Sequence, residues 1–314
     1  MDYAIELENV SKRFGRDYTA LDDVSVKIRK GDIVGYVGPN GAGKTTTIKI
    51  LTNLISPSEG SAFINGEDVN KEPTRALASV GALIEVPGLY DYLTPREMFS
   101  YFGKVYGMDK GEVCDRTTEV MEMVKLSGWE DSKMGSFSTG MQRRTALAKA
   151  IFHNPEVLIL DEPVIGLDPA GIRDVRELIK AYQKEGNTIF LSSHLLKEVG
   201  ETCDSVVFIE NGSVISHDSI ANILHGARSM SIDMTLLEHP TESELEIITA
   251  NEHVKDVCLE KDRILITYDG RRESGSSILE DAVRSGLKVF SYSPQTFSLE
   301  DYYLATIRDT GEGR

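Results

Sequence analysis

Apolar and polar residues follow two different periods along the first two thirds of the chain. Residues 3–9 and 22–29 alternate apolar with polar side chains, and residues 33–37 are apolar throughout, which predicts two half-buried strands and one strand buried on both faces. Because further apolar runs alternate with segments of helical spacing, we predict an α/β fold with a mostly parallel sheet. The other helices are predicted at about 44–54, 95–106, 111–126, 142–153 and 170–184, and the other strands at 157–160, 188–191, 206–209 and 213–216.

The spacing changes beyond about residue 228. Strands and helices there follow the order β-α-β-β-α-β before a closing helix, which predicts a small α+β domain of the ferredoxin-like kind. We therefore divide the chain into domains at 1–227 and 228–314, and we find no chemical motif in the second. Its strands are predicted at 230–236, 254–259, 263–268 and 288–293, and its helices at 241–250, 276–285 and 297–307.

Composition limits the classes of function. With 314 residues, of which 40% are hydrophobic, the chain is long enough for two domains with a sizeable core. It has no apolar run of about 20 residues and no basic-then-apolar start, so we expect a cytoplasmic protein without a membrane span. A net charge of −16 argues against a nucleic-acid partner. The three cysteines are far apart and predict incidental thiols: Cys114, Cys203 and Cys258.

A phosphate-binding loop follows the buried strand at 33–37. The segment matches G-x-x-x-x-G-K-[ST] and stands between a predicted strand and a predicted helix, where backbone N–H groups can surround phosphates. We expect Lys44 to reach the β and γ phosphates and Thr45 to offer its hydroxyl to Mg²⁺. The predicted nucleotide-binding residues are Gly38, Pro39, Asn40, Gly41, Ala42, Gly43, Lys44, Thr45 and Thr46.

Two further strand ends carry candidate catalytic groups. The apolar strand at 157–160 ends in Asp161 and Glu162; we expect Asp161 to hold Mg²⁺ through its water shell and Glu162 to polarise the attacking water. Acidic residues at a strand end can also simply cap a loop. His194 follows the strand at 188–191 and is a candidate contact of the γ-phosphate. Taken alone, a histidine at such a position is more often a helix-start or packing residue.

A second anion site is predicted about a hundred residues after the first. Phe-Ser-Thr-Gly-Met-Gln-Arg-Arg at 137–144 places a serine and a glycine just before a helical segment. A helix N-terminus of this kind, with a serine cap and outward N–H groups, receives anions.

In their order along the chain, these segments resemble the nucleotide-binding domain of ATP-binding cassette (ABC) proteins over about residues 3–226. The resemblance implies a P-loop ABC ATPase fold with N-terminal antiparallel strands and a helical subdomain at about 88–154. It implies that Phe14 stacks on adenine, that 165–168 forms the D-loop, and that Ser138 and the Gly140 N–H bind a nucleotide held by a second copy of the chain. Thr139 and Met141 depart from the commonest family motif, which has Gly and Gln there.

The same resemblance implies a transporter subunit that binds ATP and Mg²⁺ at the cytoplasmic face of the membrane, with separate permease subunits. The alternatives are a soluble ABC ATPase of translation or DNA repair and, more distantly, an adenylate-kinase-like enzyme. Glu85 stands where the family has a Gln that ligates Mg²⁺ and faces the channel. Its context, and the appended domain with Ser298–Tyr303, resemble exporters of bacitracin- and lantibiotic-type peptides. Peptides, drugs and lipids are the candidate cargoes.

Overall fold

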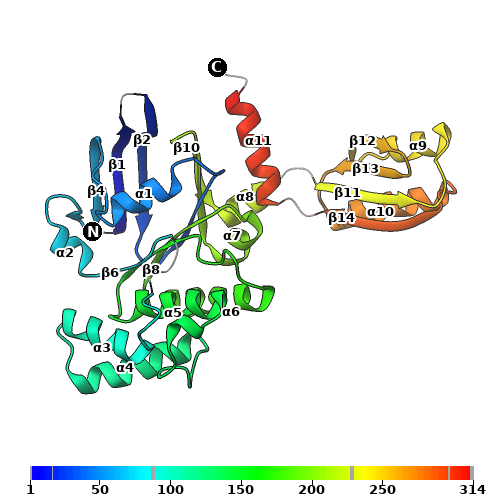
Figure 1. Ribbon diagram of the computed structural model, residues 1–314. Coiled ribbons are helices and arrows are strands. Elements are labelled where there is room, and N and C mark those ends of the chain that lie inside the picture. Colours follow the sequence, from blue (N-terminus) through cyan, green and yellow to red (C-terminus); the bar gives the residue numbers. More distant parts are fainter. Residues whose placement is uncertain (1, 16, 86–88, 227–229, 296–297, 312–314) are drawn as a thin grey trace. The chain divides into compact units, whose positions relative to one another are not determined.

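The computed structural model describes residues 2–15, 17–85, 89–226, 230–295 and 298–311, and these form two compact units (Figure 1). The units are Met1–Ser219 and Ile220–Arg314. Helix α8 (Ile220–Gly226) therefore belongs with the second unit, although the sequence placed it before the 227/228 boundary. The division into independent domains stays a prediction.

The core of the first unit is a six-stranded, mostly parallel sheet. Its middle strands are buried along their whole length, which explains their uninterrupted apolar sequences. The prediction of an α/β fold is confirmed, but the edge strand β6 was missed because it has four residues and contains a glycine. The strand order is β10 (Ser213–Ser219), β9 (Ser205–Glu210), β3 (Ile33–Val37), β8 (Thr188–Ser193), β7 (Val157–Asp161) and β6 (Val80–Leu83), with β10 antiparallel to β9.

A second, antiparallel sheet packs on the first. A single hydrophobic cluster joins apolar residues of this sheet, such as Leu7 and Val24, to Tyr36 and Phe190 of the parallel sheet and to Ile48 of α1 (Lys44–Leu51). The N-terminal antiparallel strands are thus confirmed, and they run longer than predicted. Their order is β2 (Tyr18–Arg29), β1 (Tyr3–Phe14), β4 (Glu59–Ile64) and β5 (Glu67–Asp68).

Helices complete the first unit. Helices α3 and α4 contact each other, and α4 contacts α5, at the lower side of the unit in Figure 1. Thr94 and Asp109 are the N-caps of α3 and α4, and each forms a capping box with a glutamate three residues later. None of the helices in the described ranges is long and apolar enough to cross a bilayer. The bounds are α2 (Pro73–Leu77), α3 (Pro95–Val105), α4 (Lys110–Met123), η1 (Met134–Ser136), α5 (Thr139–Ile151), α6 (Pro169–Lys184) and α7 (Leu196–Thr202).

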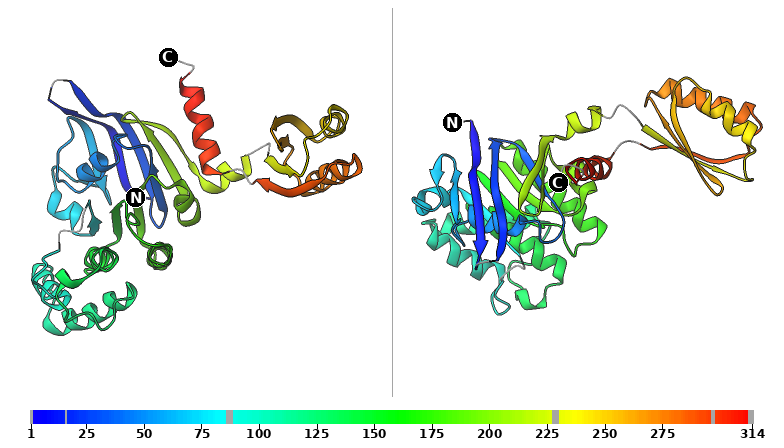
Figure 2. Two further views of the ribbon diagram at one scale, coloured as in Figure 1. Left: turned by 45° about the vertical axis from the view of Figure 1, so that its right-hand side comes forward. Right: turned by 90° about the horizontal axis from the view of Figure 1, so that it is seen from above.

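The second unit has the predicted order β-α-β-β-α-β. Two helices, α9 (Glu242–Thr249) and α10 (Arg272–Arg284), cover one face of an antiparallel sheet, where Ile248 and Ile278 join its buried residues (Figure 2). The closing helix α11 (Leu299–Gly311) contacts α8 instead of this sheet's cluster. The strand order is β12 (Val254–Glu260), β13 (Arg263–Tyr268), β11 (Met230–Leu236) and β14 (Val289–Gln295).

Candidate nucleotide site

The phosphate-binding loop connects β3 to α1, and its glycines are required by their surroundings. A Cβ atom at Gly38 would lie 2.1 Å from the Ile209 carbonyl oxygen, and one at Gly43 would lie 2.6 Å from the Leu21 side chain. Gly43 also has a left-handed backbone, with a φ of +108°, as does Gly41 with +84°. These positions therefore exclude larger residues, which keeps the loop's backbone N–H groups at the start of α1.

Lys44 is the first residue of α1 and is 7% exposed. Its Nζ donates to the carbonyl oxygens of Gly38 at 2.7 Å and Pro39 at 3.2 Å, and lies 3.8 Å from Glu162 Oε1. Burial lowers the pKa of Lys44, while the charges of Glu162 and Asp161 act in the opposite direction. The ammonium group thus lies beside the loop, at the place where phosphate oxygens would compete with these acceptors.

Thr45 and Asp161 meet across the site. Thr45 Oγ1 donates to Asp161 Oδ2 at 2.9 Å, and Ser192 Oγ donates to Asp161 Oδ1 at 2.6 Å. Asp161 is 3% exposed, so its carboxylate is held by two hydroxyl groups from neighbouring segments. Mg²⁺ prefers oxygen ligands and keeps several waters when it binds phosphates. Thr45 and Asp161 suit that mode, and within the described ranges no cluster of three or more His, Cys, Asp or Glu side chains could hold a metal.

Glu162 follows β7 with a left-handed backbone, φ 48°. Its N–H donates to Ser192 Oγ at 2.9 Å, and its Oε2 lies 2.9 Å from Nδ1 of His194. An ionised carboxylate only accepts hydrogen bonds, so Nδ1 carries the proton in this pair. The structure therefore brings both predicted catalytic side chains together with Lys44.

A cavity of about 360 Å³ opens over these groups, within the usual range for small-molecule sites. Tyr18 lines the cavity, and Phe14 is absent from its described lining. The Phe14 ring lies beside Lys12 Nζ, 5.1 Å away, and the Tyr18 ring, 6.3 Å away between centroids. Tyr18 is thus the aromatic residue in the described lining of this cavity. The full lining is Tyr18, Asn40, Gly41, Gly43, Lys44, Thr45, Thr46, Glu162, Ile165 and His194.

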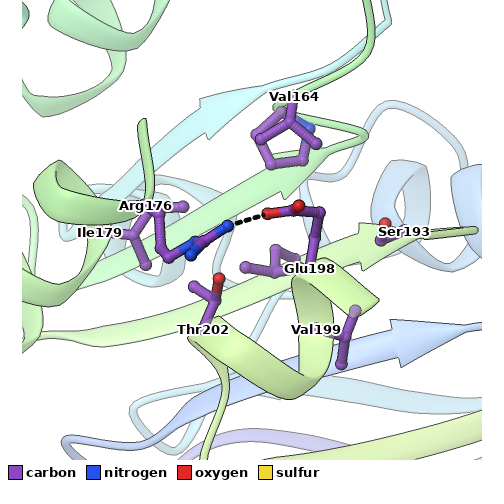
Figure 3. Close-up of a pocket in the computed structure, with 9 residues that line it drawn as sticks. Val164, Arg176, Ile179, Ser193, Glu198, Val199 and Thr202 are labelled. Carbon is purple, nitrogen blue, oxygen red and sulfur yellow. Dashed lines mark hydrogen bonds and ion pairs between the residues drawn. The ribbon is translucent and has the colours of Figure 1, made fainter. Parts of the chain in front are cut away.

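Figure 3 shows the lining of a second, much smaller cavity of about 20 Å³. It is lined by the segment after Glu162, including Val164, and by side chains of α6 and α7. Arg176 of α6 and Glu198 of α7 form an ion pair of 2.6 Å across it. Its volume suits at most one water, so it belongs to the packing between the segment after Glu162 and helices α6 and α7.

The segment at 137–144 begins α5 as predicted. Ser138 is the N-cap, and its Oγ accepts from the Met141 N–H at 3.3 Å. Ser138 is exposed, and a Cβ atom on Gly140 would meet no atom nearer than Leu167 Cδ2 at 3.6 Å. Neither residue lines the cavity at the chain's own phosphate loop.

The Glu85 carboxylate is engaged elsewhere than the other two predicted metal ligands, which bond each other. Its carboxylate forms an ion pair with Lys49 of α1, with Nζ 2.6 Å from Oε1. Its backbone is left-handed, with a φ of 56°, and its side chain is exposed. Thr45 and Asp161 are therefore hydrogen-bonded to each other, while the Glu85 carboxylate is paired with Lys49. The residues that follow it, 86–88, lie outside the described ranges.

Arg143 was missed by the sequence reasoning, although it is buried at the centre of these segments. It is 5% exposed, and its guanidinium donates to backbone carbonyl oxygens on both sides of Glu162 and to that of Glu85. The sequence could have predicted this burial, because Arg143 shares one helix face with the apolar residues Leu147 and Ala150. An arginine in such a buried stripe is unusual.

Comparison with known proteins gives concordant results. A family model described as ABC transporter matches residues 21–165. The bacitracin transport ATP-binding protein of Bacillus licheniformis is 34% identical over 98% of each chain, and the linearmycin resistance ATP-binding protein of Bacillus subtilis is 30% identical over 97% of this chain and 100% of its own. A dimeric ATP-binding cassette bound to ADP and phosphate is 25% identical, with a TM-score of 0.64 over 69% of this chain and 98% of its own.

Proposed function

This chain belongs to the ATP-binding proteins of ABC transporters, and from that premise we propose that it powers export through separate membrane subunits. As a member of this family it is an ATPase that converts ATP and water to ADP and phosphate. The single observation that carries the assignment of its active site is the convergence of Lys44, Thr45, Glu162 and His194 on one cavity. Acting at a permease would place the chain at the cytoplasmic face of the membrane.

Each residue of the site has a separate role in ATP hydrolysis. The loop 38–46 holds the phosphates with its N–H groups, and Lys44 turns from the carbonyls of Gly38 and Pro39 to the β and γ phosphates. Glu162 orients the attacking water and accepts its proton, while His194 holds the Glu162 carboxylate and contacts the γ-phosphate. Mg²⁺, bound by Thr45 and through water by Asp161, would neutralise charge on the phosphate oxygens.

The adenine base is placed by aromatic stacking at the β1–β2 hairpin. Phe14 is the residue that the family resemblance assigns to this role, and we add Tyr18, which lines the phosphate cavity and is 55% exposed. Their rings are near-parallel, with 25° between planes. We propose that Tyr18 offers the stacking surface and that Phe14 supports it, because stacking needs an open ring face.

A second copy of the chain completes each site. Ser138, which is exposed, and the Gly140 N–H stand at the positive end of a 13-residue helix, and neither lines the cavity at their own phosphate loop. They suit the γ-phosphate of a nucleotide bound to another copy, as in an ATP sandwich. The dimeric form of the cassette described above supports this arrangement.

The cargo is inferred from the relatives that share the whole chain. The bacitracin and linearmycin relatives extend through both units of this chain, so the second unit belongs to the shared architecture. We propose an antimicrobial peptide, drug or lipid as cargo, and antibiotic resistance as the consequence. No basic surface was found in the sequence that would favour the translation or DNA-repair alternative.

The dimer is tested by stalling hydrolysis. Glu162→Gln should bind ATP and Mg²⁺ without turning it over, so the nucleotide would persist between two copies. Light scattering of this variant with ATP should report a dimer, and Lys44→Ala should remain a monomer because it lacks the phosphate contact. A monomeric Glu162→Gln protein, even with the permease present, would contradict the shared site.

The role of Glu85 is tested separately. A carboxylate near the γ-phosphate is repelled unless Mg²⁺ lies between them. Glu85→Gln should leave ATP binding nearly intact, lower the Mg²⁺ dependence of turnover and alter coupling to the permease. The measurement is the ATPase rate against free Mg²⁺ with the permease in membranes. Identical ATPase curves for the variant and wild type, with unchanged transport, would show that Glu85 has no role in Mg²⁺ binding or coupling.

A further inference from the structure

The Arg143 guanidinium connects two segments that are far apart in the sequence. Nη1 donates to the Glu85 carbonyl oxygen at 2.9 Å, after strand β6. Nη2 donates to the carbonyl oxygens of Asp161, at 3.0 Å, and Glu162, at the end of β7. Nε donates to the Pro163 carbonyl oxygen at 3.2 Å. One side chain on α5 therefore bonds the backbone at the ends of two neighbouring strands.

This arrangement is an unusual use of a buried charge. All the acceptors are neutral carbonyls, and in the described ranges no carboxylate lies within ion-pair distance of Arg143. Burial lowers the pKa of Arg143, opposed by the charges of Asp161 and Glu162. Because burying a charge costs desolvation free energy that no ionic partner offsets here, packing alone does not account for an arginine at this position.

The acceptors include two strained residues. Glu85 and Glu162 both have left-handed backbones, with φ of 56° and 48°, a conformation that costs on the order of 1–3 kcal/mol at a residue other than glycine. The guanidinium has five donors in a rigid fork, so it can hold carbonyls that point at it from different directions. A shorter amide or a flexible ammonium has no such fork.

We propose that Arg143 is a positioning residue that couples the backbone at Glu85 to the backbone at Glu162. The inference rests on the proposed function in one respect: Glu162 must be the residue that activates water. A displacement of the Glu85 segment would then move the shared guanidinium and, through it, the Glu162 peptide and carboxylate. The chain would lower its ATPase rate whenever the Glu85 segment leaves the position described here.

Close packing makes this coupling direct. A Cβ atom at Gly81 of β6 would lie 2.0 Å from the Ala150 carbonyl oxygen of α5. The helix that carries Arg143 thus lies against the strand that leads to Glu85, with no room for a side chain between them. Strand β6 also pairs with β7 through Leu83 and Leu160. The guanidinium joins the two strands just beyond the point where their ladder ends.

The test compares Arg143→Met with Arg116→Met. Arg116 is a matched control because it also donates to two backbone carbonyls, those of Ile151 and Phe152, at the other end of α5. For Arg143→Met we expect kcat to fall about tenfold or more, with the affinity for ATP within about threefold of wild type. Hydrogen exchange should rise at both 83–85 and 161–164. For Arg116→Met exchange should rise near 151–153, with kcat little changed.

Several outcomes would overturn the proposal. Arg143→Met with wild-type kcat would do so, as would a rise in exchange at one of the two segments alone. If Arg143→Met does not fold, Arg143→Lys keeps the charge but lacks the fork, and it should show the same paired rise in exchange. The exchange measurement needs no ATP, so it is independent of the proposed function. Wild-type ATP turnover tests that function by itself.

Discussion

The six-stranded parallel sheet of the first unit and the antiparallel sheet of the second unit use charged residues in opposite ways. In the first unit, the phosphate loop, Glu162 and His194 follow three adjacent parallel strands, β3, β7 and β8. Carboxyl ends of parallel strands lie at one edge, so these loops converge on a single cavity. In the antiparallel sheet of the second unit, neighbouring ends alternate, and charges pair across strands instead, as Asp233 does with Arg263.

The backbone shows the same contrast. Glu85 and Glu162 both have left-handed conformations next to the site. Among the described residues of the second unit, the only non-glycine residue with positive φ is Lys261, in the turn between β12 and β13. Strain at a turn is ordinary, whereas strain at a strand end beside a cavity indicates function. The parallel topology of the first unit's sheet, and not its content of charged residues, therefore creates the site.

The largest expected effect comes from removing the Lys44 ammonium group, which lies at the edge of the parallel sheet. Lys44→Ala should lower ATP turnover by more than about a hundredfold, because it removes the charge that contacts the β and γ phosphates. Lys288→Ala is the control in the second unit, where Lys288 pairs with exposed Glu238 at 2.7 Å. A phosphate-release assay should show wild-type turnover for this control. Equal losses of ATP turnover in the two variants would contradict the contrast between the two units.

A smaller effect is expected at the aromatic pair of the β1–β2 hairpin. Tyr18→Ala should weaken ATP binding by about 1–3 kcal/mol, the value of one base stacked on an aromatic ring. Tyr18→Phe should bind normally, since the ring face remains. Titration of a fluorescent ATP analogue measures both. If Phe14→Ala weakens binding and Tyr18→Ala does not, the stacking surface belongs to Phe14 alone.

His153 should make the first unit sensitive to acid. Its ring stacks on Tyr106, its Nε2 lies 3.1 Å from the Val80 carbonyl oxygen, and its buried Nδ1 has no partner in the described residues. Burial lowers the pKa of His153 below the 6.5 of an unfolded chain. The unfolded state therefore binds the proton more readily, and the stabilisation present above pH 6.5 is lost as pH falls through the folded pKa.

The measurement is thermal unfolding between pH 7.5 and pH 5. His153→Phe should flatten the pH dependence of the first unit's transition, while at neutral pH it loses about 1 kcal/mol with the Val80 hydrogen bond. A transition of the second unit should not change between the variant and wild type. An unaltered pH dependence of the first transition would exclude His153 as its cause.

The smallest effect is expected from removing the second unit. Every phosphate-directed residue precedes it, so a chain that ends at Ser219 should bind ATP with wild-type affinity, within about twofold. The same titration of a fluorescent analogue measures this, with circular dichroism to establish folding. Loss of ATP binding by a folded, shortened chain would contradict the assignment of ATP binding to the first unit alone. Lost transport with intact binding would place the second unit in partner contact or regulation.

The sequence by itself determined the parts of the protein that depend on local pattern. Uninterrupted apolar runs identified β3, β7 and β8, alternation identified β1 and β2, and the glycine-lysine loop identified the phosphate site, because each signal lies within about ten neighbouring residues. The short elements β4, β5, β6, α2 and α7 were not predicted, since a few residues do not establish a period.

Only the tertiary structure decided which side chains meet. Ser192 holds Asp161, Lys49 pairs with Glu85, Tyr18 reaches the phosphate cavity, and Arg143 bonds the ends of two strands. Arg143 and Glu85, for example, are 58 positions apart in the sequence. No local pattern of residues predicts such a pairing. Strand order and helix packing set these distances, because they bring segments together regardless of their separation along the chain.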